Sequence, residues 1–152
     1  MGYHTEFQGQ ITIEPPLNEQ EIEYLNKFNM TRRMSRKNGP YFVDGTGEFG
    51  QGKDSDIYDY NRPPSGQPGL WCQWRPTVDG TAIEWDGGEK FYESAKWMQY
   101  IIQHFLMRGA FAAYQLPFLQ ANHVLNGVIY AEGEEQGDVW ELHVVDNEVT
   151  VK

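Results

Sequence analysis

Hydrophobic and polar residues alternate along the start of the chain, which predicts a β-strand over residues 3–13. Its apolar or small side is made of Tyr3, Thr5, Phe7, Gly9, Ile11 and Ile13. A period of two is typical of a strand with one buried face. After two consecutive prolines the apolar spacing lengthens to three or four residues, so we expect a helix over about 18–30. Asn18 and Glu21 stand at the spacing of a capping pair at its start.

Period-two alternation returns in the middle and at the end of the chain. Two adjacent runs place Leu70, Cys72 and Trp74 on one side, and then Thr81, Ile83 and Trp85. The residues between these runs end in Asp79-Gly80, which predicts a hairpin. Helical spacing predicts an amphipathic helix over about 91–107 that Gly109 ends, followed by a short helix or a loop over 110–123. Three further strands are predicted over 128–131, 140–145 and 149–151.

The predicted elements follow the order β-α-β-β-α-β-β-β. The expected class is therefore α+β, an antiparallel-rich sheet with two main helices on one face. This order resembles a ferredoxin-like sandwich with an added C-terminal hairpin. The 152 residues are the right size for a single domain, over 1–152, with one core. Fold class alone assigns no function, because such an architecture hosts many activities.

A long segment at about 34–69 interrupts the regular pattern. It contains many glycines, four prolines and little periodicity, which is too long for an ordinary connection. Its aromatic residues are Tyr41, Phe42, Phe49, Tyr58 and Tyr60. Exposed rings in a free tether would be unusual, so we expect part of this Gly/Pro/aromatic loop to fold back on the domain.

The acidic composition limits the class of partner. The net charge is −10 and the pI is near 4.7, which argues against non-specific nucleic-acid binding. The charges are unevenly placed, since Lys152 is the only cation after Arg108, against seven carboxylates. Solubility explains such acidity without any function, and imitation of DNA by the acidic C-terminal strands is an alternative.

The cysteine count and the hydropathy indicate a cytoplasmic protein. Cys72 is the only cysteine, which excludes an internal disulfide. The start of the chain lacks the pattern of a secretory signal, and no apolar run is long enough to cross a membrane. We therefore expect a cytoplasmic location and no membrane partner.

No set of residues forms a recognisable catalytic, metal or cofactor motif. Residues 45–50 match Gly-x-Gly-x-x-Gly but lack the strand and helix that a dinucleotide site requires, so a glycine-rich turn is the simpler interpretation. The four histidines are scattered singly, and Cys72 alternates with core positions. Glu84 and Asp86 share a strand face, but exposed carboxylates of this kind are usually solubilising. We therefore predict no catalytic residue, no metal and no cofactor, and we favour a non-enzymatic protein.

Arginines and aromatic residues make the best candidate binding surface. One group follows the first predicted helix, and the other surrounds the start of the hairpin. The candidate residues are Arg32, Arg33, Arg36, Tyr60, Arg62, Trp71, Trp74 and Arg75. Guanidinium groups bind phosphate or carboxylate, and Tyr, Trp and Arg are common interface anchors. A simpler explanation for the first group is that its charges complement the helix dipole or pair with internal acids.

Three patches of the sequence carry a family resemblance. They are Tyr3-His-Thr-Glu-Phe-Gln-Gly with Thr31-Arg-Arg-Met; residues 59–90; and Leu125-Asn-Gly with Gly-Glu-Glu and Val145-Asp-Asn. Together they resemble small uncharacterised proteins encoded by bacteria and their phages. The resemblance implies a stand-alone domain in a bacterial or phage-infected cytoplasm, and it implies no catalytic residue.

The sequence therefore favours one function and leaves two alternatives open. The leading hypothesis is a binding or regulatory protein that engages another macromolecule, most simply a protein, through the arginine and aromatic surface. The first alternative is a domain that binds, and could process, a nucleotide or another small anionic ligand between residues 32–37 and 59–75. The second alternative is an acidic DNA mimic that occupies a basic protein.

Overall fold

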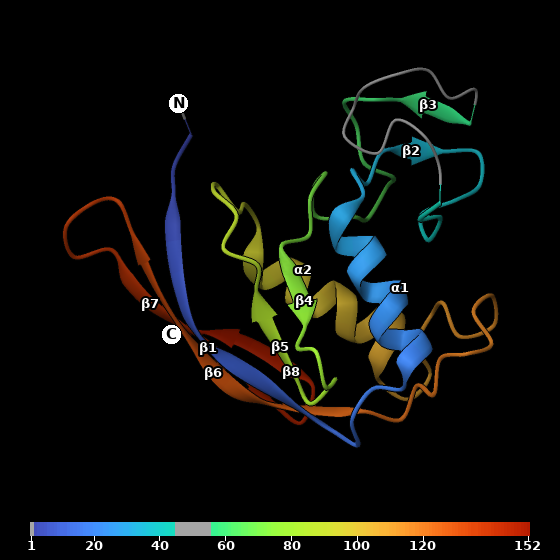
Figure 1. The fold of residues 1–152 in the computed structure, drawn as a ribbon. Helices are drawn as coiled ribbons and strands as arrows, with labels where there is room; N and C mark the ends of the chain where they lie inside the picture. The colour runs from blue at the N-terminus through green and yellow to red at the C-terminus, as the bar shows by residue number, and fades with distance from the viewer. Residues whose placement is uncertain (1, 45–55) are drawn as a thin grey trace.

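The computed structural model describes residues 2–44 and 56–152. In these two ranges eight strands, two α-helices and one π-helix follow each other along the chain (Figure 1). They are β1 (Thr5–Glu14), α1 (Glu19–Met30), β2 (Ser35–Arg36), β3 (Ile57–Asp59), β4 (Trp74–Pro76), β5 (Ala82–Trp85), α2 (Ser94–Ile101), η1 (Ile102–Leu106), β6 (Val124–Gly133), β7 (Val139–Val145) and β8 (Glu148–Val151). Six strands form one sheet in the order β4-β5-β1-β6-β7-β8, and β2 pairs with β3 in a small second sheet. Every pair of neighbouring strands in the large sheet is antiparallel.

The predicted α+β class is confirmed at a coarse level. The protein has an antiparallel six-stranded sheet and two α-helices, which lie on the same side of the sheet in Figure 1. The ferredoxin-like order is not confirmed, because the sheet order differs: β7 and β8 extend it beyond β6. Along the chain, β2 and β3 also come between α1 and β4. No helix in the described ranges is long and apolar enough to span a bilayer.

Strands β1 and β6 form the long centre of the sheet. Their register runs without a break from Thr5 opposite Gly133 to Glu14 opposite Val124. Gly9 and Gly127 both have positive φ angles, of 112° and 153°. A Cβ atom at either position would lie under 3 Å from a carbonyl oxygen of the facing strand, at 2.8 Å and 2.7 Å. The glycines therefore allow the close approach of two strongly curved strands.

Helix α1 confirms the capping prediction. Asn18 Oδ1 accepts a hydrogen bond from the Glu21 amide, at 2.7 Å, and Glu21 Oε1 accepts one from the Asn18 amide, at 2.9 Å. This reciprocal pair satisfies amides that the first helical turn leaves without partners. Tyr24, Leu25 and Phe28 then bury the inner face of the helix.

The second predicted helix is confirmed only in part. It begins at Ser94, because Glu93 before it adopts a left-handed backbone with φ of 59°. It continues past Ile101 as the π-helix η1, which ends at Leu106. Residues 110–123 form turns rather than a helix, in accord with the loop interpretation.

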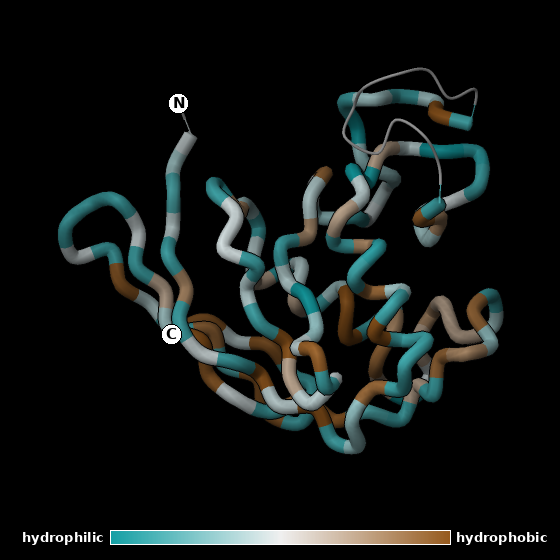
Figure 2. The backbone as a smooth tube through the Cα atoms, in the orientation of Figure 1, coloured by the Kyte–Doolittle hydropathy of each residue, from teal (hydrophilic) through white to brown (hydrophobic). Residues whose placement is uncertain are grey.

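The core lies between the inner face of the sheet and the two helices, and aromatic rings fill much of it. The Phe7 ring on β1 contacts four other rings edge-on, with ring centres 5.3–5.9 Å apart. They belong to Trp74, Trp85, Phe91 and Trp140. Edge-on packing of rings adds to the energy of burying their apolar area. Figure 2 shows the hydrophobic stretches gathered where sheet and helices meet, and a largely hydrophilic β2–β3 segment.

Candidate functional site

Residues 32–36 and residues 60–70, the arm, lie side by side, as the binding hypothesis requires. The Arg33 amide donates to the Leu70 carbonyl at 2.7 Å, and the Ser35 amide donates to the Arg62 carbonyl at 2.9 Å. Arg32 Nε also donates to the Tyr60 carbonyl at 3.0 Å. Part of the predicted 34–69 loop therefore folds back on the domain. The Gly-x-Gly-x-x-Gly match at 45–50 lies outside the described residues.

Two of the candidate arginines are buried and act within the fold. Arg33 Nη2 donates to the carbonyls of Pro40 and Phe42, at 2.8 Å and 2.7 Å. Its guanidinium carbon lies 4.2 Å from the centre of the Phe28 ring. Because burial removes water from this cation, it lowers the pKa of Arg33 to about 10. Arg36 is also buried, and its Nη1 lies 3.4 Å from a carboxylate oxygen of Asp56.

The other candidate residues do not share one exposed surface. Trp74 is buried, and its indole Nε1 donates to the Ser94 carbonyl at 2.8 Å. Arg75 lies on the edge strand β4 and pairs with Glu84 on β5, at 3.1 Å. The Arg62 side chain is 82% exposed, and Trp71 and Tyr60 are half-buried. The structure thus brings Arg32, Tyr60 and Arg62 together but leaves Trp74 in the core, so a role for the full set in binding stays a prediction.

A carboxylate and an imidazole form a fully buried pair at the start of α1. His123 Nε2 lies 2.9 Å from Glu21 Oε2, and neither side chain is exposed. His123 Nδ1 lies 2.6 Å from the Pro15 carbonyl oxygen, so both ring nitrogens face acceptors. Burial acts to lower the pKa of His123, but the hydrogen bonds to Glu21 and Pro15 outweigh it and raise the pKa. This pair has no access to a substrate, and it joins α1 to residues far along the chain.

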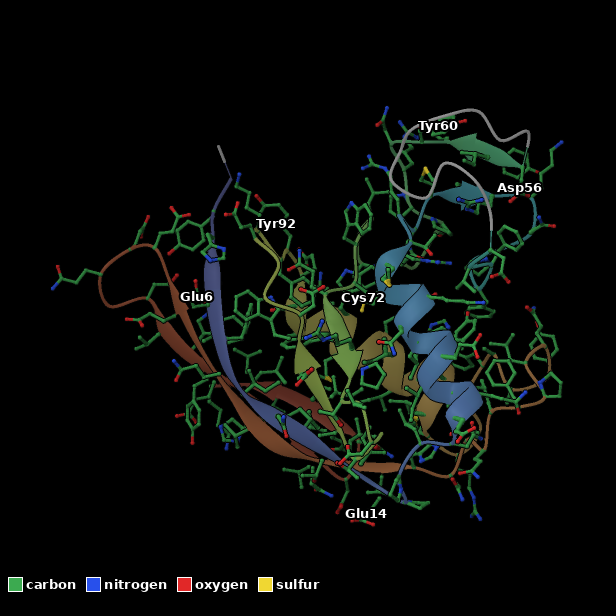
Figure 3. All side chains as sticks on the ribbon, in the orientation of Figure 1. Glu6, Glu14, Asp56, Tyr60, Cys72 and Tyr92 are labelled. Atoms are coloured by element: carbon green, nitrogen blue, oxygen red, sulfur yellow. The ribbon has the colours of Figure 1, made fainter. Side chains whose placement is uncertain are left out.

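The outer face of the large sheet holds a different arrangement. A hollow of ≈ 480 Å³, the acidic hollow, lies over β1, β6 and β7. Its lining residues are Glu6, Gln8, Tyr130, Ala131, Glu132, Val139, Trp140, Glu141 and Lys152. Strand pairing arranges seven of them in two rows, Gln8–Tyr130–Glu141–Lys152 and Glu6–Glu132–Val139. Figure 3 places Glu6 well away from Tyr60, so the hollow and the arm lie on separate parts of the molecule.

The charge pattern of the acidic hollow is unfavourable for the isolated protein. Glu6 and Glu132 stand directly opposite each other on paired strands, where like charges destabilise a sheet. Glu141 adds a third carboxylate on the next strand, and Lys152 is the only cation among the described residues of the lining. Tyr130 and Val139 remain 56% and 64% exposed between these charges. Carboxylates around an exposed ring are suited to holding an ammonium or guanidinium group.

The histidines near the outer face stand beside two of these carboxylates. His4 Nε2 lies 2.9 Å from Glu6 Oε1, and His143 Nε2 lies 2.6 Å from Glu141 Oε1. Within residues 2–44 and 56–152, no group of three potential metal ligands converges. The hollow therefore offers a surface for charge recognition, and its described side chains do not form a metal centre.

A second hollow, the arm pocket, lies between the arm and α2, with a volume of ≈ 460 Å³. Its lining residues are Gly66, Gln67, Pro68, Glu93, Lys96, Gln99, Tyr100, Gln103 and His104. The His104 ring stacks on Tyr100 with ring centres 3.8 Å apart, and its Nδ1 lies 2.6 Å from the Tyr41 hydroxyl. Burial lowers the pKa of His104 to about 4, so its imidazole is neutral at pH 7.

Sequence reasoning detected part of the acidic hollow and missed its centre. The excess of carboxylates after Arg108 was visible, and it includes Glu132 and Glu141. Nothing in the sequence indicated that Glu6, at the other end of the chain, lies opposite Glu132. Only the order and register of the strands bring these residues together, although period-two alternation did predict that Glu6 lies on the polar face of its strand.

No family model matches this chain, and no curated protein or solved structure shows significant similarity to it. The resemblance to small bacterial and phage-encoded proteins therefore stays a prediction.

Proposed function

We propose that this is a non-enzymatic binding protein that engages a basic segment of another macromolecule, most simply a protein, through the acidic hollow. The observation that carries the proposal is the direct opposition of Glu6 and Glu132 on paired strands, beside the exposed Tyr130 ring. Repulsion between these two carboxylates lowers the stability of the free protein. A bound cation would relieve the repulsion, which explains why the two charges are placed together. The proposal keeps the predicted class of function and moves the binding surface from the arginines to the sheet.

The composition of the acidic hollow indicates what the partner presents. Three carboxylates attract Lys or Arg side chains, and the Tyr130 ring and Val139 accept their aliphatic stems or a guanidinium face. The protein's net charge of −10 would also steer a basic partner toward it. The proposal therefore includes the DNA-mimic hypothesis as one case, in which the partner is a nucleic-acid-binding protein. The buried thiol of Cys72, whose pKa burial raises to about 12, suits the reducing cytoplasm that we propose as the location.

A titration with an arginine-rich peptide tests this proposal. The peptide is a labelled octa-arginine, and the variant is the triple substitution Glu6→Gln, Glu132→Gln and Glu141→Gln. A matched control, Glu19→Gln, Glu23→Gln and Glu89→Gln, removes the same charge from exposed positions outside the hollow. We expect the hollow variant to weaken binding by about tenfold or more, because it removes the charged hydrogen bonds, and the control to weaken it far less. Equal loss in both variants would show attraction to net charge alone and would refute a defined site.

A small polar ligand in the arm pocket is a second candidate function. It is favoured by Gln67 Oε1, which is buried and has no hydrogen-bond partner among the described residues. Gln67 also lines the pocket. A buried unpaired acceptor costs stability, which a ligand donor would restore. We expect a nucleotide or nucleobase that binds there to raise the melting temperature, and Gln67→Leu to remove the effect. No shift with any nucleotide at millimolar concentration would eliminate this function.

We infer that β4, β5, β1 and β6, with α1 and α2, form a ferredoxin-like unit that β7 and β8 extend. Support comes from the connection of β1 to β4 through α1 and of β5 to β6 through α2. An experimental structure in which β5 does not lie between β4 and β1 would contradict it.

A further inference from the structure

Strand β8 forms one edge of the large sheet, and its outward backbone groups are free to pair. Its ladder with β7 uses Lys152, whose amide and carbonyl both bond to Glu141 at 2.9 Å. In an antiparallel ladder such residues alternate, so Thr150 and Glu148 also face β7. The amides and carbonyls of Val149 and Val151 therefore point away from the sheet, and no described residue bonds to them. An exposed edge of this kind is a template for another strand.

The side chains of β8 are complementary to a second copy of the same strand. A two-fold axis at Thr150 would place Val149 opposite Val151 of the second copy, and Glu148 opposite Lys152 of the second copy. This register pairs the free backbone groups with each other, because they belong to Val149 and Val151. It also matches opposite charges at both ends of the strand. No described residue forms an ion pair with Lys152.

We propose that this protein forms a symmetric dimer in which two β8 strands pair antiparallel about Thr150 and join the two sheets. Apolar exposure supports this register, since Val151 is 55% exposed on the inner side of the strand and would meet Val149 of the second copy. The opposite edge is less suited to pairing, because β4 is three residues long and ends in Pro76, which has no amide proton.

The dimer would also change the acidic hollow. Lys152 lines that hollow and, in the part of the chain that the structure describes, is its only cation. In the proposed register Glu148 of the second copy lies beside Lys152 and offsets its charge. The two outer faces would then form one continuous surface with an acidic hollow on each copy. This inference does not depend on what the hollow binds, because it rests on the β8 edge.

Charge reversal in two separate variants tests the register. Glu148→Lys places two lysines opposite each other at each end of the interface, and Lys152→Glu places two glutamates there. We expect analytical ultracentrifugation to show a reversible dimer for the natural chain, and each variant to raise its dissociation constant by about tenfold at low salt. In a mixture of the two variants every pair is again of opposite sign, so a heterodimer should form with the affinity of the natural dimer. A natural chain that stays monomeric at millimolar concentration, or a mixture that does not associate, would overturn the proposal.

Disulfide crosslinking tests the same register of the two β8 strands and does not depend on charge. In the variant Thr150→Cys, the introduced thiols of the two copies would face each other as a non-hydrogen-bonded pair, in which the Cβ atoms come closest. Under mild oxidation we expect this variant to form a covalent dimer rapidly. The control is Gln10→Cys, an exposed position in the same cross-strand row of the outer face but on β1. Cys72 is buried in the natural chain and should not react in either variant. Crosslinking of Thr150→Cys no faster than Gln10→Cys would refute pairing at β8.

Discussion

Carboxylates on the two sides of the large sheet have opposite environments. On the inner side, Glu21 is completely buried, and each of its oxygens accepts hydrogen bonds from His123 and from a backbone amide of Asn18 or Gln120. On the outer side, Glu6 and Glu132 are exposed and stand directly opposite each other. The buried charge is thus supplied with partners that fix the fold. The exposed carboxylates of Glu6 and Glu132 repel each other. Their placement is explained if they contribute to binding rather than to stability.

Removal of the buried carboxylate should give the largest loss of stability. Glu21→Ala leaves His123 buried without its carboxylate partner and removes the hydrogen bond from the Asn18 amide, so we expect the free energy of unfolding to fall by about 3–5 kcal/mol. Chemical denaturation measures this change. The control is Glu23→Ala, on the exposed side of the same helix, which should change the stability by about 0.5 kcal/mol or less. Similar losses for both variants would contradict the difference between the faces.

Replacement of Trp74 should give the next largest loss of stability. It also distinguishes a role in the core from a role in binding. Trp74→Phe leaves a cavity and removes the hydrogen bond to the Ser94 carbonyl, so we expect a loss of about 2 kcal/mol. Binding of the arginine-rich peptide should be unchanged under conditions in which the variant is folded. A variant with native stability and lost binding would instead support the sequence prediction that Trp74 is an anchor.

The pH dependence of stability further distinguishes the buried Glu21–His123 pair from the exposed carboxylates of the outer face. Hydrogen bonds to Glu21 and Pro15 raise the pKa of His123, so its contribution is complete below its ordinary pKa of about 6.5 and is lost as the pH rises through the raised value. Burial acts to raise the pKa of Glu21, but its hydrogen bonds lower it. Its contribution is therefore complete above about pH 4.5 and is lost as the pH falls through the lowered value.

Thermal unfolding between pH 4 and pH 9 measures this effect. We expect the pair to stabilise the protein most between about pH 4.5 and pH 6.5, and its contribution to decline above that range. The variant His123→Gln should show a flatter profile above pH 6.5. A natural protein whose stability rises steadily from pH 6 to pH 9 would contradict a charged Glu21–His123 pair.

A substitution on the outer face should give the smallest change in stability, and this change should be an increase. Glu132→Gln removes the repulsion with Glu6, so we expect the melting temperature to rise by about 1–3 °C. The same variant should bind the arginine-rich peptide about threefold to tenfold more weakly. Differential scanning calorimetry and a binding titration measure the two effects. A fall in both stability and binding would indicate that Glu132 is a structural residue.

Local patterns in the sequence predicted the elements that local interactions form. Asn18 and Glu21 indicated the start of α1, and alternation indicated β1 and the C-terminal strands. The same residues gave no sign of their distant partners, since His123 lies 102 residues from Glu21. Helical spacing also predicted a continuous helix to about residue 107, because apolar periodicity does not distinguish the π-helix over Ile102–Leu106 from an α-helix.

The candidate site was harder to predict for the same reason. Arg33 looked like an exposed cation, but its partners are the carbonyls of Pro40 and Phe42 and the ring of Phe28, which are available only after the chain has folded. Trp74 was a candidate anchor because tryptophan is common at interfaces, but its indole is buried in the core. A one-residue change of register would reverse such an assignment, and single-sequence patterns do not fix register between distant strands.

A map of the peptide contact by NMR tests the central claim most directly. Isotope-labelled protein is titrated with the arginine-rich peptide, and the backbone amide shifts of all resolved residues are followed. We predict that the largest shifts occur at Glu6, Gln8, Tyr130, Glu132 and Glu141, and that they diminish as salt screens the charges. Shifts centred on the arm, or spread evenly over every acidic residue, would contradict a binding site on the outer face of the sheet.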